Sequence, residues 1–184
     1  MGKVTYVAVL AHGEADEADI TTRQRIDAAV KRVHEIYDEG MSEPILVFMA
    51  GIGRQDSLFT LATYMLLYAR ECLRRRPALA DVQIVYNCRE HEVWGTILEM
   101  EWALKTIRAK CPSAEIEYVT NARHGARVTL VSRMLHRVPC KITVSKDTPP
   151  PLWHETLAYL KVVAHVIGRH KKLESLRRRF YSGG

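Results

Sequence analysis

The chain has 184 residues, of which 47% are hydrophobic and 26% are charged, and its formal net charge is +6. This composition is typical of a globular domain, and a chain of this length buries roughly 70% of its unfolded surface without disulfides or metals. The sequence has neither a run of about 18 apolar residues nor a charged leader before its first apolar segment. It therefore argues against a transmembrane helix and against a secretory signal.

Apolar strands alternate with amphipathic helices along the whole chain. Gly40 is the expected stop of the first helix, Asp56 or Ser57 the expected cap of the second, and Pro77 marks the end of the second. The expected elements are strands over 4–10, 45–50, 82–87, 115–120 and 141–144, and helices over about 22–39, 57–75, 96–110, 124–136 and from 153 to beyond 166.

Strands and helices that alternate in this way predict an α/β fold. We expect a mostly parallel sheet of about five strands with helices on both faces, in a single domain over 1–168. Apolar helices such as 58–73 are expected to cover the sheet, and a homodimer interface is the alternative.

Ligands of open parallel sheets bind beyond the carboxyl ends of the strands, so the loops at those ends form the expected site. These loops span 11–21, 51–57, 88–95, 121–124 and 145–153. Their polar residues are His12, Glu14, Asp16, Arg54, Asp56, Glu90, His91, Glu92, Asn121, Arg123, His124, Lys146, Asp147 and His154.

Three glycines, Gly13, Gly51 and Gly53, lie at strand-to-helix turns. Glycine lets backbone amides approach a ligand closely, and a helix N-terminus attracts anions. We therefore predict that these glycines and Arg54 bind a cofactor or phosphate. Gly51-x-Gly53 lacks the third glycine of a dinucleotide fingerprint, so a tight turn is the alternative interpretation.

His12, His91 and His124 follow three different strands. Together with Glu92 they have the residue types that hold a divalent metal. They equally suit general acid–base chemistry, and their spacing does not choose between the two. We give the metal the lower weight and predict none.

His124 and Arg127 form the most specific pair, because residues three apart at the start of a helix share a face. Arg127 can bind an oxyanion through two parallel hydrogen bonds, and His124 can move a proton near neutral pH. In the alternative interpretation, His124 is the helix N-cap and Arg127 pairs with a nearby carboxylate. The sequence does not decide between them.

The C-terminal end carries most of the positive charge, since residues 169–179 contain six cations and one anion. Such a basic tail, over 169–184, can contact RNA or an anionic membrane. A solvated helix end whose cations suit the helix dipole is the interpretation that we favour, so nucleic acid is not an expected partner. The four cysteines form no Cys-x-x-Cys pair, which predicts reduced residues in a cytoplasmic protein.

The run Val119-Thr120-Asn121-Ala122-Arg123-His124-Gly125-Ala126-Arg127 resembles the Val-Thr-Ser-x-x-His-x-x-Arg segment of the YdcF-like domain family. The remaining similarities follow in order over roughly 4–165. They are Val7–Gly13 for the first strand and glycine turn, Arg25-Ile26-x-x-Ala29 for the first helix, Ala50-Gly51 for a Ser-Gly-Gly turn, Thr96 for the threonine of an Asn-Thr-x-Glu-Asn element, and Glu155 for the closing segment.

The resemblance implies a Rossmann-like three-layer sandwich and a nucleotide-type ligand such as S-adenosylmethionine. It adds Thr96, Thr120 and Asn121 to the predicted cofactor-binding residues. The sequence departs from the family pattern around Thr96, where Gly95 and Leu98-Glu99 replace the asparagine and glutamate.

We therefore predict a small-molecule enzyme, a hydrolase or transferase, that acts on a nucleotide-like or phosphorylated substrate. His124 is the predicted acid or base, Arg127 the anion contact, and His12 an assisting residue. A non-catalytic regulatory module that binds S-adenosylmethionine or a nucleotide is the alternative, because the departures fall within the predicted site.

Overall fold

A computed structural model describes residues 3–12, 19–40, 42–51, 59–90, 92–93, 95–149 and 151–166. The strands are β1 (Val4–Val9), β2 (Glu43–Phe48), β3 (Gln83–Tyr86), β4 (Glu115–Thr120) and β5 (Lys141–Val144). The helices are α1 (Ile20–Glu39), α2 (Leu61–Arg74), α3 (Thr96–Lys110), α4 (Ala122–Val131) and α5 (Leu152–Val166), with a 3-10 turn η1 (Pro77–Leu79) and a π-helical turn η2 (Ser132–His136).

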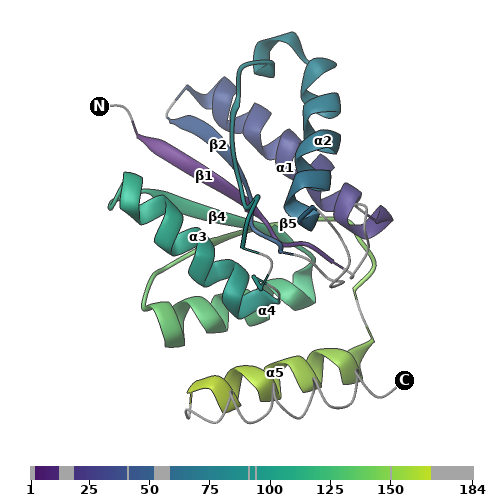
Figure 1. Ribbon diagram of the computed structural model, residues 1–184, viewed down its shortest axis with the longest axis vertical. Helices are drawn as coiled ribbons and strands as arrows, with labels where there is room; N and C mark the ends of the chain where they lie inside the picture. The colour runs from purple at the N-terminus through teal and green to yellow at the C-terminus, as the bar shows by residue number, and fades with distance from the viewer. Residues whose placement is uncertain are drawn as a thin grey trace.

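The five described strands form one parallel sheet in the order β3-β2-β1-β4-β5. Helices cover both of its faces, so the predicted α/β three-layer sandwich is confirmed (Figure 1). The strand order reverses between β1 and β4. In open parallel sheets, the crevice beyond the carboxyl ends at such a reversal is where ligands bind.

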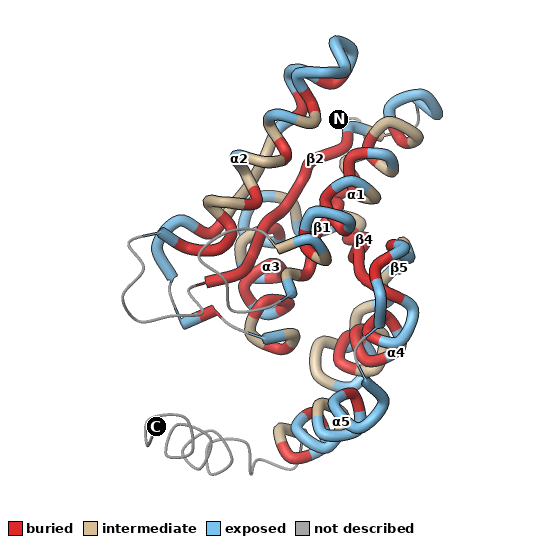
Figure 2. The backbone as a smooth tube through the Cα atoms, turned by 90° about the vertical axis from the view of Figure 1, so that its right-hand side faces the viewer, coloured by how far each residue is buried: buried red, intermediate tan, exposed pale blue. Residues whose placement is uncertain are grey.

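Alternating side chains of β1 divide the core into two layers. Val7 and Val9 pack with α1 and α2, whereas Tyr6 and Ala8 pack with α3 and α4 on the opposite face. The buried strands β1, β2 and β4 run through the centre of the molecule in Figure 2. The apolar residues of α2 cover the sheet, as expected of the segment 58–73.

Caps define where several helices begin and end. The carboxylate of Asp19 accepts a hydrogen bond from the N–H of Thr22 at 2.6 Å, so α1 begins at Ile20, two residues before the expected start. Gly40 ends α1 in the left-handed conformation, with φ of 63°, and its N–H donates to the carbonyl of Tyr37. The predicted C-terminal stop is therefore confirmed.

The second helix begins later than expected. Asp56 and Ser57 lie outside the described residues, and α2 starts only at Leu61. The N–H of Leu61 donates to the carbonyl of Gly51 at 2.9 Å. A backbone carbonyl therefore accepts the first amide of the helix, in place of a capping side chain. Thr60 occupies the N-cap position, but its hydroxyl donates to the backbone carbonyl that follows β3.

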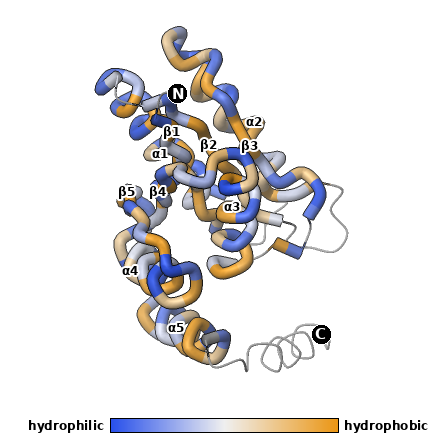
Figure 3. The backbone as a smooth tube through the Cα atoms, turned by 90° about the vertical axis from the view of Figure 1, so that its left-hand side faces the viewer, coloured by the Kyte–Doolittle hydropathy of each residue, from blue (hydrophilic) through white to orange (hydrophobic). Residues whose placement is uncertain are grey.

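Helix α5 lies against α4, apart from the sheet (Figure 1). It buries Glu155, Val162 and Ala164. Its exposed apolar residues are Leu152, Trp153, Leu157, Leu160 and Val163, and hydrophobic segments are visible along α5 in Figure 3. Within the described part of the chain, no helix is both long enough and apolar enough to cross a membrane.

Candidate functional site

Ten polar residues gather where β1, β4 and β5 end and where α3 and α4 begin. We call this group the strand-end cluster: Arg25, Thr96, Glu99, Thr120, Asn121, His124, Arg127, Ser145, Asp147 and Glu155. All of them except Thr96 are buried, and Thr96 is partly exposed. Burial of polar groups is costly unless they are paired, so the hydrogen bonds within the cluster decide what it can do.

The ring of His124 lies between two threonine hydroxyls. Its Nε2 is 2.8 Å from the Oγ1 of Thr96, and its Nδ1 is 2.8 Å from the Oγ1 of Thr120. Burial, followed by the positive charges of Arg127 and Arg25, holds the pKa of His124 well below its ordinary value. The ring is therefore neutral at neutral pH, with one donor nitrogen and one acceptor nitrogen.

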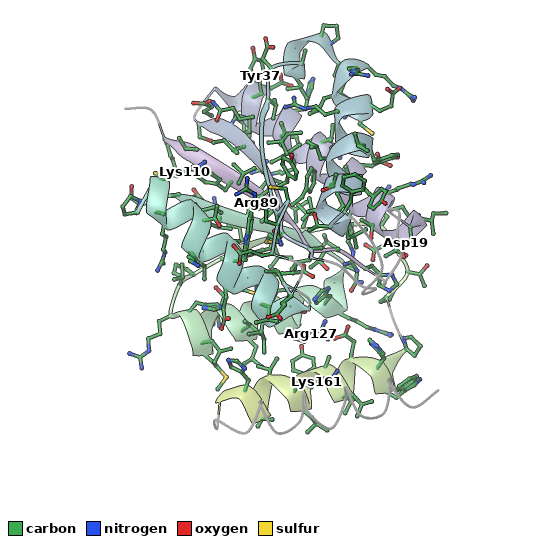
Figure 4. The ribbon with its side chains drawn as sticks, viewed as in Figure 1. Asp19, Tyr37, Arg89, Lys110, Arg127 and Lys161 are labelled. Carbon is green, nitrogen blue, oxygen red and sulfur yellow. The ribbon has the colours of Figure 1, made fainter. Side chains whose placement is uncertain are left out.

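Arg127 reaches the same threonine. One terminal nitrogen of its guanidinium donates to the Oγ1 of Thr96 at 3.2 Å, and the other donates to a carboxylate oxygen of Glu155 at 2.9 Å. Figure 4 shows Arg127 between α4 and α5. The prediction that His124 and Arg127 share a helix face is confirmed, because both contact Thr96.

In the alternative interpretation, His124 is the helix N-cap and Arg127 pairs with a carboxylate. The first part is wrong and the second is confirmed. Asn121, not His124, is the N-cap of α4, since its side-chain oxygen accepts the backbone N–H of His124 at 2.9 Å. Asparagine is among the residues that cap helices best, which explains why Asn121 rather than His124 occupies the N-cap position. Arg127 does pair with a carboxylate, that of Glu155.

Arg25 and Asp147 form a fully buried ion pair, with side-chain exposures of 1% and 0%. Two guanidinium nitrogens of Arg25 donate to one carboxylate oxygen of Asp147, at 3.0 and 3.2 Å. The third nitrogen donates to the carbonyls of Leu10 and Ala11 at 2.9 and 3.1 Å. This pair therefore fixes α1 to the ends of β1 and β5.

Asp147 also receives hydrogen bonds from Asn121, at 3.0 Å, and from Ser145. Burial alone would raise its pKa, but the hydrogen bonds from Arg25, Ser145 and Asn121, together with the charge of Arg25, hold that pKa below its ordinary value. Asp147 is therefore a permanent anion at neutral pH, and it positions the N-cap of α4.

Glu99 is buried on the first turn of α3, three residues after Thr96. Burial raises the pKa of Glu99 to about 7. Hydrogen bonding to the backbones of Ala11 and Gly95 and the charges of Arg25 and Arg127 act in the opposite direction, with a smaller effect. Glu99 thus changes its charge near neutral pH.

His12 lies at the rim of this region rather than in the cluster. Its side chain is 43% exposed, and its Nδ1 is 2.9 Å from a carboxylate oxygen of Asp19. Its backbone N–H and carbonyl both bond to the hydroxyl of Thr22. His12 is therefore engaged by the start of α1, although its charge still lowers the pKa of His124.

Of the three glycines predicted to bind a ligand, Gly51 lies among the described residues. Gly51 is buried and its N–H donates to the carbonyl of Val93, so this amide is bonded within the protein. Gly13, Gly53 and Arg54 lie outside the described residues.

The alternative of a histidine metal site finds no support in the described part of the chain. No group of three or more His, Cys, Asp or Glu side chains there is arranged to hold a metal ion. His91 lies outside the described residues. His12 and His124 are bonded instead to Asp19 and to two threonines.

Arg25, Glu99 and Glu155 belong to the cluster but were not among the predicted site residues. One signal for Arg25 was present, because it lies next to Ile26 and four residues before Ala29 on the apolar face of α1. A charge on such a face indicates a buried partner. For Glu99, the signal was its position three residues after Thr96, which puts both on one face of α3.

The arrangement suits proton transfer at a hydroxyl group. The oxygen of Thr96 is within hydrogen-bonding distance of a neutral imidazole and of a guanidinium, and Thr96 is the one residue of the cluster that is partly exposed. An imidazole can accept the proton of a hydroxyl group, and a guanidinium can stabilise the charge that develops on the oxygen. Comparisons with protein-family models, with curated proteins and with solved structures give no match to this chain.

Proposed function

We propose that this protein is a small-molecule enzyme that acts on a nucleotide-like or phosphorylated substrate at the strand-end cluster, as a hydrolase or transferase. One observation carries the proposal. The hydroxyl of Thr96, a partly exposed residue, lies 2.8 Å from the neutral imidazole of His124 and 3.2 Å from the guanidinium of Arg127. A base and a cation on one hydroxyl oxygen are parts that transfer of a phosphoryl or acyl group uses.

In this proposal, Arg127 contacts the anionic group of the substrate and His124 accepts a proton through Thr96. The low pKa of His124 makes it a weak base before substrate binds. Burial is the largest cause of that low pKa, and the charges of Arg127 and Arg25 come next. A bound anion offsets the effect of these two charges. Thr120 holds the other ring nitrogen and sets the orientation of the imidazole.

The resemblance to the YdcF-like domain family supports a nucleotide-type ligand, and S-adenosylmethionine is one such molecule. Thr96 and Arg127 fit the carboxylate or phosphate of a ligand of this class. Thr120 and Asn121, the other two residues proposed for cofactor binding, are bonded to His124 and Asp147. Their contribution to binding is therefore to position these neighbours.

A non-catalytic nucleotide-binding or S-adenosylmethionine-binding module is the second candidate. It is favoured by the fact that both ring nitrogens of His124 already have partners and that Arg127 already pairs with Glu155. In that case the cluster is a rigid support for a ligand, and no proton moves. For either function we propose a cytoplasmic location, which the four free cysteines support.

The test combines binding with turnover. A panel of nucleotides, S-adenosylmethionine and p-nitrophenyl phosphate is screened by thermal shift, and each stabilising compound is assayed for product. Thr96→Val removes the hydroxyl and keeps the shape of the side chain, and Thr156→Val is the matched control because Thr156 is exposed on α5. If the protein is an enzyme, turnover should fall at least a hundredfold in Thr96→Val and should be unchanged in the control Thr156→Val.

The other outcomes separate the candidates. Stabilisation without product supports the binding module. A Thr96→Val protein that folds and turns over at the wild-type rate rules out the proposed role of Thr96. No stabilisation by any compound of the panel contradicts both functions.

A further inference from the structure

Two buried atoms of the strand-end cluster have no hydrogen-bond partner among the described residues. They are the Oε2 of Glu99 and the Nε of Arg127. Glu99 is 4% exposed and Arg127 is 8% exposed. A buried polar atom without a partner costs about 1–3 kcal/mol, so two of them in one functional cluster require an explanation.

Both atoms belong to side chains that flank Thr96. Glu99 follows Thr96 by three residues on α3, and Arg127 donates to the Oγ1 of Thr96 from α4. The two side chains are close enough for the charge of each to shift the pKa of the other. The unpartnered acceptor and the unpartnered donor therefore both belong to side chains that neighbour Thr96, the partly exposed residue of the cluster.

The charges around Glu99 are otherwise balanced. Arg25 of α1 pairs with Asp147 after β5, and Arg127 of α4 pairs with Glu155 of α5. His124 is neutral and is the remaining titratable group of the cluster, with His12 at the rim. An ionised Glu99 is thus the unmatched charge, and a protonated Glu99 leaves the cluster neutral.

We propose that the protonated carboxyl of Glu99 and the Nε–H of Arg127 form an oxyanion-binding subsite, so that the protein takes up a proton when it binds an anionic ligand. This inference deepens the proposed function and rests on it for the ligand class. A phosphate, sulfate or carboxylate oxygen accepts both hydrogen bonds, which satisfies the two buried atoms at once.

Protonation of Glu99 decides whether the subsite can bind an anion. The ionised carboxylate has no proton to donate, and its charge repels an oxyanion. The pKa of Glu99, about 7, means that the free protein is mostly protonated at this residue at pH 6 and mostly ionised at pH 8.5. Above pH 7, one proton is therefore taken from solvent for each anion bound.

Sulfate is the probe, because its charge does not change between pH 6 and 8.5. Its dissociation constant is measured by calorimetry at both pH values, with sodium chloride at matched ionic strength. We expect the affinity of the wild type for sulfate to fall at least tenfold from pH 6 to pH 8.5. Glu99→Gln keeps a donor at this position without the charge, so its affinity is expected to change less than twofold. Glu101→Gln, on the exposed side of α3, is the matched control and follows the wild type.

A second measurement counts the protons. Titration at pH 8 in two buffers of different ionisation enthalpy is expected to show about one proton taken up per sulfate by the wild type and none by Glu99→Gln. Sulfate binding with the same pH dependence in Glu99→Gln and the wild type overturns this inference but leaves the anionic ligand of the proposed function in place. Loss of sulfate binding by Glu99→Gln at pH 6 also overturns it. A wild type that binds no sulfate at pH 6 contradicts the subsite and the proposed anionic ligand together.

Discussion

The Nε2 of His124 lies 2.8 Å from the hydroxyl of Thr96, although the two residues are 28 positions apart and belong to different helices. Thr96 opens α3 and His124 lies in the first turn of α4, so this hydrogen bond joins two helix N-termini on one face of the sheet. The same two termini meet where the strand order reverses. Thr96, the partly exposed residue of the cluster, is therefore held at the position where the fold favours a ligand.

The neutral state of His124 gives the protein a pH-dependent stability. Because its pKa in the folded protein is lowered, the unfolded chain binds a proton first as the pH falls. The contribution of His124 to the free energy of unfolding is complete above about pH 6.5, its unfolded pKa, and is lost as the pH falls below that value. Urea denaturation at pH 7.5 and pH 5 measures this loss. His34, half-exposed beside Asp38, provides the control: His34→Gln should keep the loss, and His124→Gln should show a smaller one.

Asp147→Asn is expected to lower the free energy of unfolding by about 3–5 kcal/mol, because it leaves the guanidinium of Arg25 buried without its counter-charge. Chemical denaturation of the variant checks the value. Asp38→Asn is the matched control, since Asp38 is exposed and, among the described residues, pairs with a surface histidine alone, and its effect should stay within about 0.5 kcal/mol. A loss below about 1 kcal/mol in Asp147→Asn would mean that the pair does not hold α1 to the ends of β1 and β5.

Glu99→Gln is expected to stabilise the protein at pH 8.5 and to have little effect at pH 5. The raised pKa of Glu99 means that the folded state binds its proton more tightly than the unfolded state does. That contribution is present below about pH 4.5 and is lost as the pH rises through 7. A shift from 4.5 to about 7 corresponds to roughly 3 kcal/mol, as an upper limit for the gain. Equal stabilisation at both pH values would show that the charge of Glu99 is not responsible.

Gly125 allows α4 to approach β5 closely. A Cβ added at this position would lie 2.9 Å from the Cγ2 of Ile142, so one of the two elements would have to move. We expect Gly125→Ala to lower the free energy of unfolding by about 1 kcal/mol, since overpacking outweighs the better helix propensity of alanine. In an Ile142→Ala background the sign should reverse, to a gain of about 1 kcal/mol, because only the propensity remains. Destabilisation of similar size in both backgrounds would argue against the contact.

Local patterns predicted most of the fold. The bounds of α3, β4 and β5 match the expected ranges. The start and end of such an element can be predicted from its own apolar pattern and the turn residues on either side of it. The start of α2 was misplaced because its first amide is bonded by the carbonyl of Gly51, which no pattern within the helix reports.

The sequence could indicate which residues of the candidate site lie together only where they are close in the chain. His124, Arg127 and Asn121 lie in one segment whose helical spacing brings them together. The partners that decide their chemistry come from elsewhere. Thr96 was predicted only through a resemblance, and Glu155 lies 28 residues after the arginine that it binds. Such pairings depend on the order of the strands, which a single sequence does not state.

The ion pair between Arg25 and Asp147 spans 122 residues of the chain. During synthesis, α1 is complete long before Asp147 leaves the ribosome, so an early packing of α1 on β1 would bury a guanidinium whose carboxylate does not yet exist. Contacts between distant residues also form late in folding, because the long loop must close before they can be made. Arg25 therefore gains its counter-charge only after β5 and the loop that follows it have been made, which couples assembly of the cluster to synthesis of the chain through Asp147.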